Sequence, residues 1–286
     1  MVDQEAFQEI LCCPDCRSNL LREAGSLVCG ECGAHYPIAD GIPHFVESLA
    51  DSGIASSEPW LNSLKNKLKA YPNFYWFLAN VCSPVMPTGK SPQVLLNRLP
   101  SSAVVLNLGS GTKRISSSVL NVDLLPFKEV DIVADITRLP FQDSSVDGVI
   151  NEVALEHIPD CQTAITEMQR VLKSGGYLYA SVPFLLGYHP SPDDYHRWTI
   201  QGLIADFDRL ETIETGIGGG PTSALLWILQ EWLAMFLSFN IPLLYKALWI
   251  ILMVLTSPLK LLDLVLSRYS MAWKIASGFY YLGVKK

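Results

Sequence analysis

Two Cys-x-x-Cys pairs near the start of the chain have the spacing of a metal site. They consist of Cys13 with Cys16 and Cys29 with Cys32, four of the seven cysteines. Two residues between paired cysteines let both thiolates reach one tetrahedral ion at about 2.3 Å. Because four thiolates leave no open coordination position, we expect a structural Zn²⁺ that supplies most of the stability of a short zinc ribbon. Redox-active or unrelated cysteines are the alternative interpretation.

A glycine-containing loop follows an apolar run and could approach a nucleotide-like ligand. Residues 104–108 have strand character and lead into Gly109-Ser110-Gly111, and a second strand-like segment ends at Asp123. Only nine residues, 112–120, follow the loop before that segment, so the usual crossover helix does not fit. A pyrophosphate would therefore lack the helix N-terminus that normally binds it. S-adenosylmethionine carries no phosphate, and it suits such a short loop better than NAD does.

Five strand-like segments predict a parallel sheet whose strands are joined by helices or loops. The segments are 104–108, 120–123, 130–134, 148–151 and 176–182, and a helix is predicted over 163–172. This order is typical of an α/β fold that binds its ligand at the carboxyl ends of the strands.

Residues at these carboxyl ends form the predicted cofactor site. Asp123 is placed to bind the hydroxyls of a ribose. Asp135 and Ile136 are placed to bind adenine, and Asn151 and Glu152 lie at the reaction mouth. The full predicted set is Asn107, Gly109, Ser110, Gly111, Asp123, Leu124, Asp135, Ile136, Asn151 and Glu152.

The cysteine-containing segment resembles a known family over residues 8–47. The similar motifs are Cys13-Pro14-Asp15-Cys16, Cys29-Gly30-Glu31-Cys32-Gly33, Tyr36-Pro37-Ile38 and Asp40-Gly41-Ile42-Pro43. They resemble the Trm112-like zinc ribbons, which occur as partners of methyltransferases or fused to them.

Residues 101–215 resemble class I S-adenosylmethionine-dependent methyltransferases of the methyltransferase-11 type. The similar strings are VLNLGSG, NVDL, VADITRLPFQDSSVDGVINEVALEHI and EMQRVLKSGGYLYASVPF. The resemblance implies a Rossmann-like methyltransferase sheet with S-adenosylmethionine as its cofactor. Asn107 stands where this family commonly has an acidic residue that organises the methionine amino group.

Histidines and charged residues after the fourth and fifth strands form the predicted acceptor side. Methyl transfer to a hydroxyl requires alignment, exclusion of water and removal of a proton. The predicted catalytic residues are His157, His189 and Asp194, and Arg197 could hold an anionic group. The alternative is a structural hydrogen-bond cluster of Asp194, Tyr195 and Arg197.

Residues 221–275 hold most of the apolar excess of the chain. The longest uncharged runs, 232–245 and 247–259, are shorter than the roughly 20 residues that span a bilayer. The flanking segments 210–217 and 277–286 are predicted to be the last strands of one sheet, so the insertion must enter and return or lie flat. We expect amphipathic interfacial helices or a shallow re-entrant hairpin. A spanning hairpin, a dimer interface and an internal core are the alternatives.

Aromatic and basic residues of this insertion are typical of a membrane interface. The predicted anchors are Trp227, Trp232, Tyr245 and Trp249 near the headgroups, with Lys246 and Lys260 extending toward water. A smaller aromatic segment, residues 71–86, is expected to pack beside the insertion as a lid or second membrane contact.

The distribution of charge narrows the class of function. The net charge is −7, and residues 101–220 carry 8 basic and 16 acidic side chains, which disfavours a nucleic-acid groove and with it an RNA methyltransferase. Residues 221–286 carry 6 basic and 2 acidic side chains, a balance that suits an anionic membrane surface. The N-terminus has no apolar signal sequence. We therefore expect a cytoplasmic protein with peripheral or monotopic membrane association.

These features predict an α/β chain of five regions. They are a Trm112-like ribbon (1–50), a helical linker or lid (51–100), a methyltransferase core (101–220), an apolar membrane-associating insertion (221–275) and a last strand (276–286). The predicted activity is methyl transfer from S-adenosylmethionine to a hydrophobic or lipid-linked acceptor at the membrane surface. No nucleic-acid partner is expected, and oligomers are possible. The alternative is a non-catalytic membrane-associated adaptor with a degenerate cofactor site.

Overall fold

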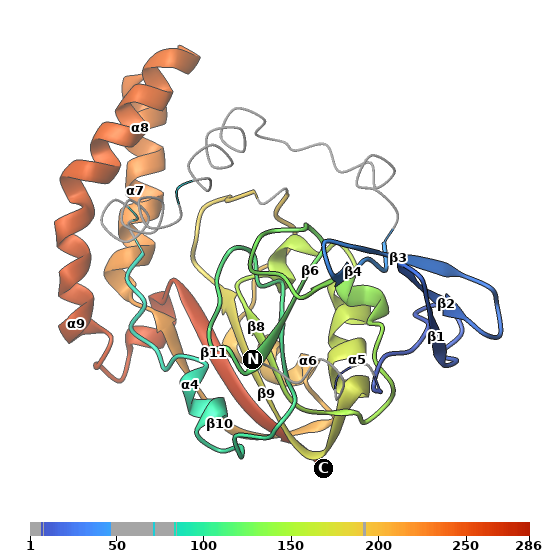
Figure 1. Ribbon diagram of the computed structural model, residues 1–286. Coiled ribbons are helices and arrows are strands. Elements are labelled where there is room, and N and C mark those ends of the chain that lie inside the picture. The colour runs from blue at the N-terminus through green and yellow to red at the C-terminus, as the bar shows by residue number, and fades with distance from the viewer. Residues whose placement is uncertain (1–6, 8, 47–70, 72–82, 84, 191–192) are drawn as a thin grey trace.

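A seven-stranded sheet forms the centre of the computed structural model, which describes residues 7, 9–46, 71, 83, 85–190 and 193–286 (Figure 1). Its strand order is β10-β11-β9-β8-β5-β6-β7. The strands are β5 (Val105–Leu108), β6 (Val119–Asp123), β7 (Ile132–Val133), β8 (Val146–Glu152), β9 (Leu172–Pro183), β10 (Leu210–Gly219) and β11 (Gly278–Lys285). The first five are joined in parallel, and β11 is antiparallel to both of its neighbours. This confirms the predicted α/β fold and its two last strands.

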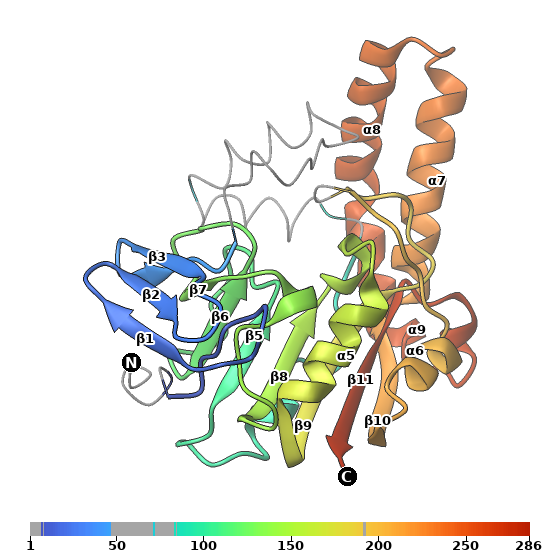
Figure 2. The same ribbon diagram turned by 90° about the vertical axis from the view of Figure 1, so that its right-hand side faces the viewer.

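The central strands β5 and β6 are buried along their whole length because both faces of the sheet are covered. Every residue of β5 and β6 is buried, as is usual in parallel sheets with a layer on each side. Helix α5 (Cys161–Val171) lies over one face of the sheet, in front of β8 and β9 (Figure 2). It buries Cys161, Ala164, Ile165, Met168 and Val171, which are spaced by three or four residues. Its N-terminus is capped by the side chain of Asp160, which accepts a hydrogen bond from Thr163 N. The remaining short helices of the core are α4 (Gln93–Leu96), α6 (Ile200–Asp206), η1 (Ile136–Arg138) and η2 (Leu155–His157).

The cysteine-containing segment forms a separate small sheet that is attached to the β7 edge of the central one. Its strands are β1 (Leu20–Glu23), β2 (Ser26–Cys29), β3 (His35–Ala39) and β4 (Ile42–Pro43). Phe45 N donates to Val133 O at 2.8 Å, and Cys12 N donates to Pro140 O at 3.0 Å. Side chains of the segment, including Tyr36 and Phe45, belong to the same hydrophobic core as the central sheet. The ribbon and the sheet therefore share one core.

The apolar insertion forms a helical hairpin at the opposite edge of the sheet. Helices α7 (Pro221–Leu237) and α8 (Pro242–Thr256) extend side by side away from the sheet (Figures 1 and 2). The chain continues through η3 (Ser257–Leu262), α9 (Asp263–Leu266) and η4 (Ala272–Ile275) to β11. Asp263 is buried and accepts hydrogen bonds from Thr222 N at 2.7 Å and Ser223 N at 2.8 Å. It thereby caps the first turn of α7 and fixes the base of the hairpin.

The hairpin exposes large apolar side chains along both of its helices. Buried positions of α7 include the small or polar residues Ala224, Gln230 and Ala234, whereas Trp232 and Phe236 are exposed. Within the part of the chain that the structure describes, α8 has no buried residue. An internal core is therefore excluded for α8.

One helical stretch, Pro242–Leu266, is 25 residues long and is apolar enough to cross a membrane by length and composition. The lengths of the uncharged runs underestimate the length of this helical stretch, because it continues through the charged residues Lys246, Lys260 and Asp263. Lys260 does not extend toward water as predicted: it is buried, and its Nζ donates to Ser83 O at 2.8 Å. Of the predicted lid, residues 51–70, 72–82 and 84 lie outside the described part of the chain.

Candidate active site

The glycine loop after β5 passes directly beneath the chain that follows β8. Gly109 and Gly111 have φ angles of 71° and 56°, which favour glycine. A Cβ on Gly109 would lie 2.5 Å from the Cβ of Ala154. Only a glycine therefore fits between β5 and the segment that leads to the acceptor-side residues.

Asp123 at the end of β6 binds this loop. Its Oδ2 accepts a hydrogen bond from Gly111 N at 2.7 Å, and its Oδ1 accepts one from Leu125 N at 2.9 Å. These two bonds orient the Asp123 side chain at the end of β6, beside the glycine loop. Leu124, the next predicted cofactor residue, is half-buried beside it.

The other predicted cofactor residues lie along the same edge with different partners. Asp135 caps η1 by accepting from Thr137 N at 2.8 Å, and Ile136 packs against Gly109. Glu152 pairs with Lys113, whose Nζ lies 2.9 Å from Glu152 Oε2. Lys113 stands two residues after Gly111, and its link across the loop to Glu152 was not predicted.

Asn107 lies below the loop, where it takes part in a buried amide network. Its Nδ2 donates to Asn121 Oδ1 at 3.0 Å, and Asn121 Nδ2 donates to the carbonyls of Lys113 and Glu129 at 3.1 and 2.8 Å. Through Asn121, the amide of Asn107 therefore supports the backbone after the glycine loop. Sequence reasoning missed Asn121, because nothing in a strand pattern distinguishes a buried asparagine from a surface one.

Two buried polar atoms at this edge have no hydrogen-bond partner among the described residues. They are Ser110 Oγ and Asn151 Oδ1; Asn151 uses only its Nδ2, which donates to Leu108 O at 3.0 Å. Buried polar atoms without partners are costly unless a ligand or water satisfies them. The edge therefore fits a polar ligand. A cavity of about 610 Å³ lies elsewhere, between β10, β11 and the base of the hairpin, and none of the predicted cofactor residues lines it.

The chain bends sharply at Val153, between β8 and the acceptor-side residues. Val153 has a φ of 52°, and its N donates to Ser181 O at 2.9 Å. A β-branched residue in this conformation is strained, and such strain concentrates at functional sites. The bend directs the following residues, Glu156 and His157, toward the loop after β9.

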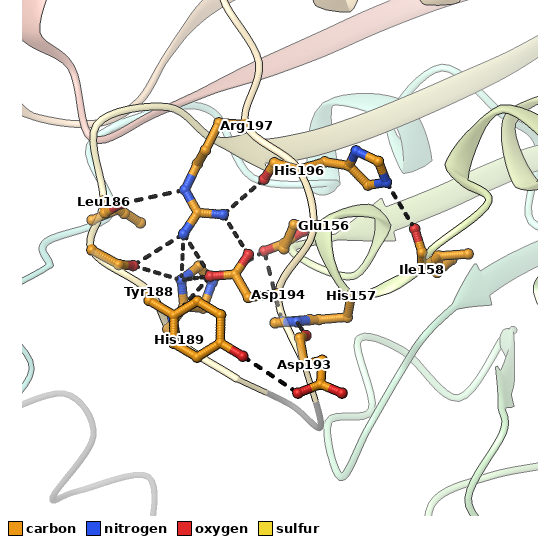
Figure 3. Close-up of polar contacts among 11 residues, drawn as sticks. Glu156, His157, Ile158, Leu186, Tyr188, His189, Asp193, Asp194, His196 and Arg197 are labelled. Carbon is orange, nitrogen blue, oxygen red and sulfur yellow. Dashed lines mark hydrogen bonds and ion pairs between the residues drawn. The ribbon is translucent and has the colours of Figure 1, made fainter. Parts of the chain in front are cut away.

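The acceptor-side residues converge in one cluster that includes the carboxylate of Glu156 (Figure 3). Glu156 is fully buried, and its Oε1 lies 3.4 Å from His189 Nε2 and 3.9 Å from His157 Nε2. The imidazole rings of His157 and His189 meet edge to face with centroids 5.3 Å apart. The adjacent Glu-His pair in the sequence was the available signal for Glu156.

Asp194 and Arg197 hold the loop that carries His189. Asp194 accepts from His189 N at 2.8 Å and pairs with both terminal nitrogens of Arg197. Burial alone would raise the pKa of Asp194, but the hydrogen bonds from Arg197 and His189 hold it below its usual value. This is the structural cluster that was the alternative interpretation.

Arg197 has no donor left for an anionic acceptor group, contrary to one expectation. Its five N–H groups bond to Asp194 and to the carbonyls of Leu186, Gly187 and His196. Asp194 therefore neutralises the charge of Arg197, and the hydrogen bonds of the guanidinium stabilise the loop.

Burial lowers the pKa of His157 below its ordinary value of 6.5. The nearby carboxylate of Glu156 acts in the opposite direction but does not cancel this effect. His157 Nδ1 donates to Asp193 O at 2.6 Å, which directs Nε2 toward Glu156. A neutral imidazole oriented in this way can accept a proton or bind a metal ion.

Trp227 of α7 lies against this cluster rather than near headgroups as predicted. Its ring meets that of His189 with centroids 5.7 Å apart, and its Nε1 is buried with no hydrogen-bond partner among the described residues. A Cβ on Gly187 would lie 2.4 Å from this Nε1. The hairpin thus reaches the acceptor-side loop directly.

The four predicted metal-binding cysteines come together as one cluster in the ribbon. The Sγ atoms of Cys13, Cys16, Cys29 and Cys32 all lie within 4.8 Å of one another. Cys13 Sγ is 3.6 Å from Cys32 Sγ, and Cys16 Sγ is 3.3 Å from Cys29 Sγ. These separations fit four thiolates around one ion with bonds of about 2.3 Å.

Two family models match the chain. Residues 95–180 match the methyltransferase domain, and residues 5–41 match the Trm112p-like proteins. These matches and the strand order confirm the class predicted from the sequence, a methyltransferase fold of the S-adenosylmethionine-dependent type joined to a Trm112-like ribbon.

Curated relatives match about a third of the chain. A probable S-adenosylmethionine-dependent methyltransferase of Mycobacterium tuberculosis is 37% identical over 97 residues, which are 31% of this chain and 35% of the relative. An uncharacterized 37.1 kDa protein in a transposon of Streptomyces fradiae is 29% identical over 102 residues, 36% of this chain and 28% of that protein. The chain thus spans about a third of the length of the curated relatives that it matches.

Solved structures with similar folds share little sequence. The 1,6-didemethyltoxoflavin-N1-methyltransferase of Burkholderia thailandensis is 14% identical with a TM-score of 0.46, covering 92% of this chain and all of that one. Phosphoethanolamine N-methyltransferase 2 of Haemonchus contortus is 18% identical with a TM-score of 0.44, covering 70% of this chain and 53% of that one.

Proposed function

We propose that the protein transfers the methyl group of S-adenosylmethionine to a hydrophobic or lipid-linked acceptor presented by a membrane surface. The observation that carries this proposal is the contact between Trp227 of α7 and His189 of the acceptor-side cluster. Through this contact an exposed apolar hairpin adjoins the mouth of the candidate active site. An acceptor held in the lipid beside α7 would approach the cluster without crossing water.

The carboxyl edge of the sheet offers the groups that would hold the cofactor. Gly109 and Gly111 permit close approach of the backbone, and Asp123 presents oriented carboxylate oxygens. Ser110 Oγ and Asn151 Oδ1 supply buried polar atoms that a ligand would satisfy. When bound, S-adenosylmethionine supplies an electrophilic methyl group on a sulfonium. The chain has to align the acceptor with it and exclude water.

The acceptor-side cluster would bind and deprotonate the acceptor. His157 and His189 present imidazole nitrogens in a nearly dry pocket, and Asp194 positions the loop of His189. Because burial lowers the pKa of His157, this imidazole is neutral near pH 7 and able to take a proton. Asp194 acts here as a positioning residue, since Arg197 and His189 N occupy its oxygens.

The ribbon would bind a structural Zn²⁺ through Cys13, Cys16, Cys29 and Cys32. Tyr36 supports this site, because its hydroxyl lies 3.1 Å from Cys13 Sγ and donates to Asp15 at 3.0 Å. Four thiolates would complete the coordination shell. The ribbon ion therefore has no part in the methyl transfer itself.

Membrane association would be carried by the hairpin. Its exposed side chains include Phe239 and Leu243 at the turn between α7 and α8, and Met235 and Leu255 along the helices. Exposed apolar surface on this scale marks a site for lipid or for another protein. We propose lipid, with the hairpin entering the bilayer from the cytoplasmic side.

Two measurements test this function with full-length, metal-loaded protein in detergent. Isothermal titration with S-adenosylmethionine should show binding, weakened by about 10–100-fold in Asp123→Asn because one charge-assisted acceptor is lost. Incubation with methyl-labelled cofactor and extracted membrane lipids should transfer label to the organic phase. Absence of cofactor binding by the folded wild-type protein would instead favour the non-catalytic adaptor.

A further inference from the structure

Three potential ligands for a metal ion meet in the acceptor-side cluster, far from the ribbon cysteines in the sequence. Glu156, His157 and His189 each direct one carboxylate oxygen or imidazole nitrogen inward, and these atoms lie within 4.8 Å of one another. Glu156 Oε1 is 3.4 Å from His189 Nε2 and 3.9 Å from His157 Nε2. Ligands around one ion with bonds of about 2.1 Å are separated by roughly 3.0–3.5 Å. Small side-chain rotations would bring all three onto one ion.

Hydrogen-bond acceptors lie on the outer side of both imidazoles. His157 Nδ1 faces Asp193 O at 2.6 Å, which can only accept, so this Nδ1 donates. His189 Nδ1 faces Gly187 O at 3.2 Å and Asp194 Oδ2 at 3.3 Å, and it also lies 3.3 Å from Arg197 Nη2. When His189 Nδ1 donates to one of these oxygens, both imidazoles present the Nε2 lone pair toward Glu156. Metal-binding histidines are usually oriented by such a bond to their other nitrogen.

In that tautomer two imidazole lone pairs and a carboxylate meet in a buried pocket, where a positive charge between them would be stabilising. Glu156 is fully buried, and its Oε2 has no hydrogen-bond partner among the described residues. Arg197, the nearby cation, lies on the far side of His189 and is matched by Asp194. The carboxylate of Glu156 is therefore not neutralised by a described side chain at this position. A cation bound between Glu156, His157 and His189 would resolve this.

We propose that Glu156, His157 and His189 bind a divalent first-row transition-metal ion. Two imidazoles and one carboxylate suit ions such as Fe²⁺, Co²⁺, Ni²⁺ or Zn²⁺ better than Mg²⁺ or Ca²⁺, which prefer oxygen ligands. Three protein ligands leave coordination positions open, in contrast to the four-cysteine cluster. An oxygen atom of the acceptor would occupy one of them and be oriented beside the cofactor edge.

The role of this metal site rests on the proposed function, but binding of the metal can be tested without any methyl transfer. If the ion is bound, His157 and His189 act as its ligands, and the acceptor hydroxyl would be made more acidic by the ion. The binding of the metal alone needs neither cofactor nor acceptor. Failure of methyl transfer with intact metal binding, or the converse, would therefore separate the two proposals.

The experiment is a titration of the metal-free, full-length protein in detergent with Co²⁺. We expect about two equivalents per chain, one for each site. The cysteine site gives intense thiolate-to-metal charge-transfer bands in the near ultraviolet. The Glu-His-His site gives ligand-field bands in the visible range without thiolate bands, so the two are resolved by their spectra.

Three variants assign the second equivalent. Glu156→Gln and His189→Ala should abolish the ligand-field bands and leave the thiolate bands unchanged. Asp194→Asn, which disturbs the support of His189 and the pair with Arg197, should weaken the second site by about 10–100-fold. His196→Gln is the matched control: this histidine belongs to the same loop, but its ring contacts the carbonyls of Ile158 and Pro159 outside the cluster. It should retain both equivalents.

Two results would overturn the proposal. One is a single equivalent with thiolate bands only, in wild-type protein whose circular dichroism shows a folded chain; a proton shared between Glu156 and a histidine would then account for the geometry. The other is a second equivalent that persists in both Glu156→Gln and His189→Ala. Because Glu156→Gln preserves side-chain volume, loss of binding in that variant is not explained by misfolding if its circular dichroism is unchanged.

Discussion

Arg17 of the ribbon and Glu167 of α5 are 150 residues apart in sequence, and their side chains form an ion pair with 3.0 Å between Nη2 and Oε1. Arg17 Nη1 also donates to Leu139 O at 2.9 Å, and Glu167 Oε2 accepts from Leu139 N at 2.9 Å. Arg170 completes this network with two further bonds to Glu167. The ribbon is thus tied to the methyltransferase fold through a nearly buried carboxylate.

Replacing Glu167 with glutamine should destabilise the whole chain. The side chain of Glu167 is only 7% exposed and accepts charge-assisted bonds from two arginines. We expect the free energy of unfolding to fall by about 1–3 kcal/mol in urea denaturation. Arg138→Gln is the control, because the pair of Arg138 with Asp15 is well exposed; it should cost at most about 1 kcal/mol. Equal effects would mean that the Glu167 network does not join the two parts.

The carboxylate of Glu167 should also make the free energy of unfolding depend on pH. Burial alone would raise the pKa of Glu167, but Arg170 and Arg17 hold it below the ordinary value of 4.5. A lowered pKa in the folded state stabilises the fold above the unfolded pKa, and this contribution is lost as the pH falls through the folded pKa. Wild-type stability should therefore decrease with acidification below about pH 4.5 more steeply than that of Glu167→Gln. Parallel curves from chemical denaturation would contradict the assignment.

Gly109→Ala should impair cofactor binding through one steric contact. The added Cβ would lie 2.5 Å from the Cβ of Ala154, so the loop after β5 or the segment after β8 has to move. We expect the affinity for S-adenosylmethionine to fall by about tenfold or more in calorimetry. The double variant Gly109→Ala, Ala154→Gly removes the clash and should recover part of the affinity. Gly25→Ala, at a positive φ with no atom within 4 Å, should leave cofactor binding unchanged.

Polar substitutions at the hairpin turn should weaken membrane binding without unfolding the protein. Phe239 and Leu243 are 82% and 79% exposed, so they contribute little to the fold. Burying such a side chain in lipid is worth about 1.5–3 kcal/mol. Phe239→Ser and Leu243→Ser should each reduce partitioning into anionic vesicles about tenfold or more in a flotation assay. Leu21→Ser, an exposed apolar position in the ribbon, is the control. Unchanged flotation of both hairpin variants, with a change in oligomeric state, would point to a dimer interface instead.

Removal of metal from the ribbon should loosen it and its attachment. The segment is short, and its cysteine cluster replaces much of the core that a larger domain would have. We expect a chelator to release Zn²⁺ and to increase proteolysis within residues 9–46, and Cys29→Ser to behave in the same way without chelator. Cys12→Ser should not, because Cys12 lies outside the four-cysteine cluster. Resistance of chelated protein to proteolysis would indicate a ribbon that folds without metal.

The elements and their order could be predicted because they depend on local patterns. The cysteine spacing defined the ribbon, and the apolar runs predicted β5, β6, β8 and β9 in sequence. The glycine loop and Asp123 were placed at one edge because parallel strands end on the same side of a sheet. Residues 51–100 had weak local signals, and most of them lie outside the described part of the chain.

The partners that each of these side chains contacts could not be predicted, because those partners are distant in sequence. Arg197 was expected to bind an anion, but the loop turns back so that its five donors meet carbonyls and Asp194. Lys260 was expected in water, but η3 packs it against Ser83. Trp227 was expected among headgroups, but α7 leaves the sheet beside β9 and its loop, where the ring meets His189.

The sequence by itself determined that this chain joins a four-cysteine ribbon, a parallel sheet with a glycine loop, and an apolar insertion, since residue spacing and hydropathy encode such features locally. Only the tertiary structure decided that the insertion is an exposed hairpin, that Arg17 reaches Glu167, and that Glu156 lies between His157 and His189. The last of these relationships arises because strands β8 and β9 lie side by side and the loops that follow them converge. No pattern of neighbouring residues specifies such contacts between segments that are distant in sequence.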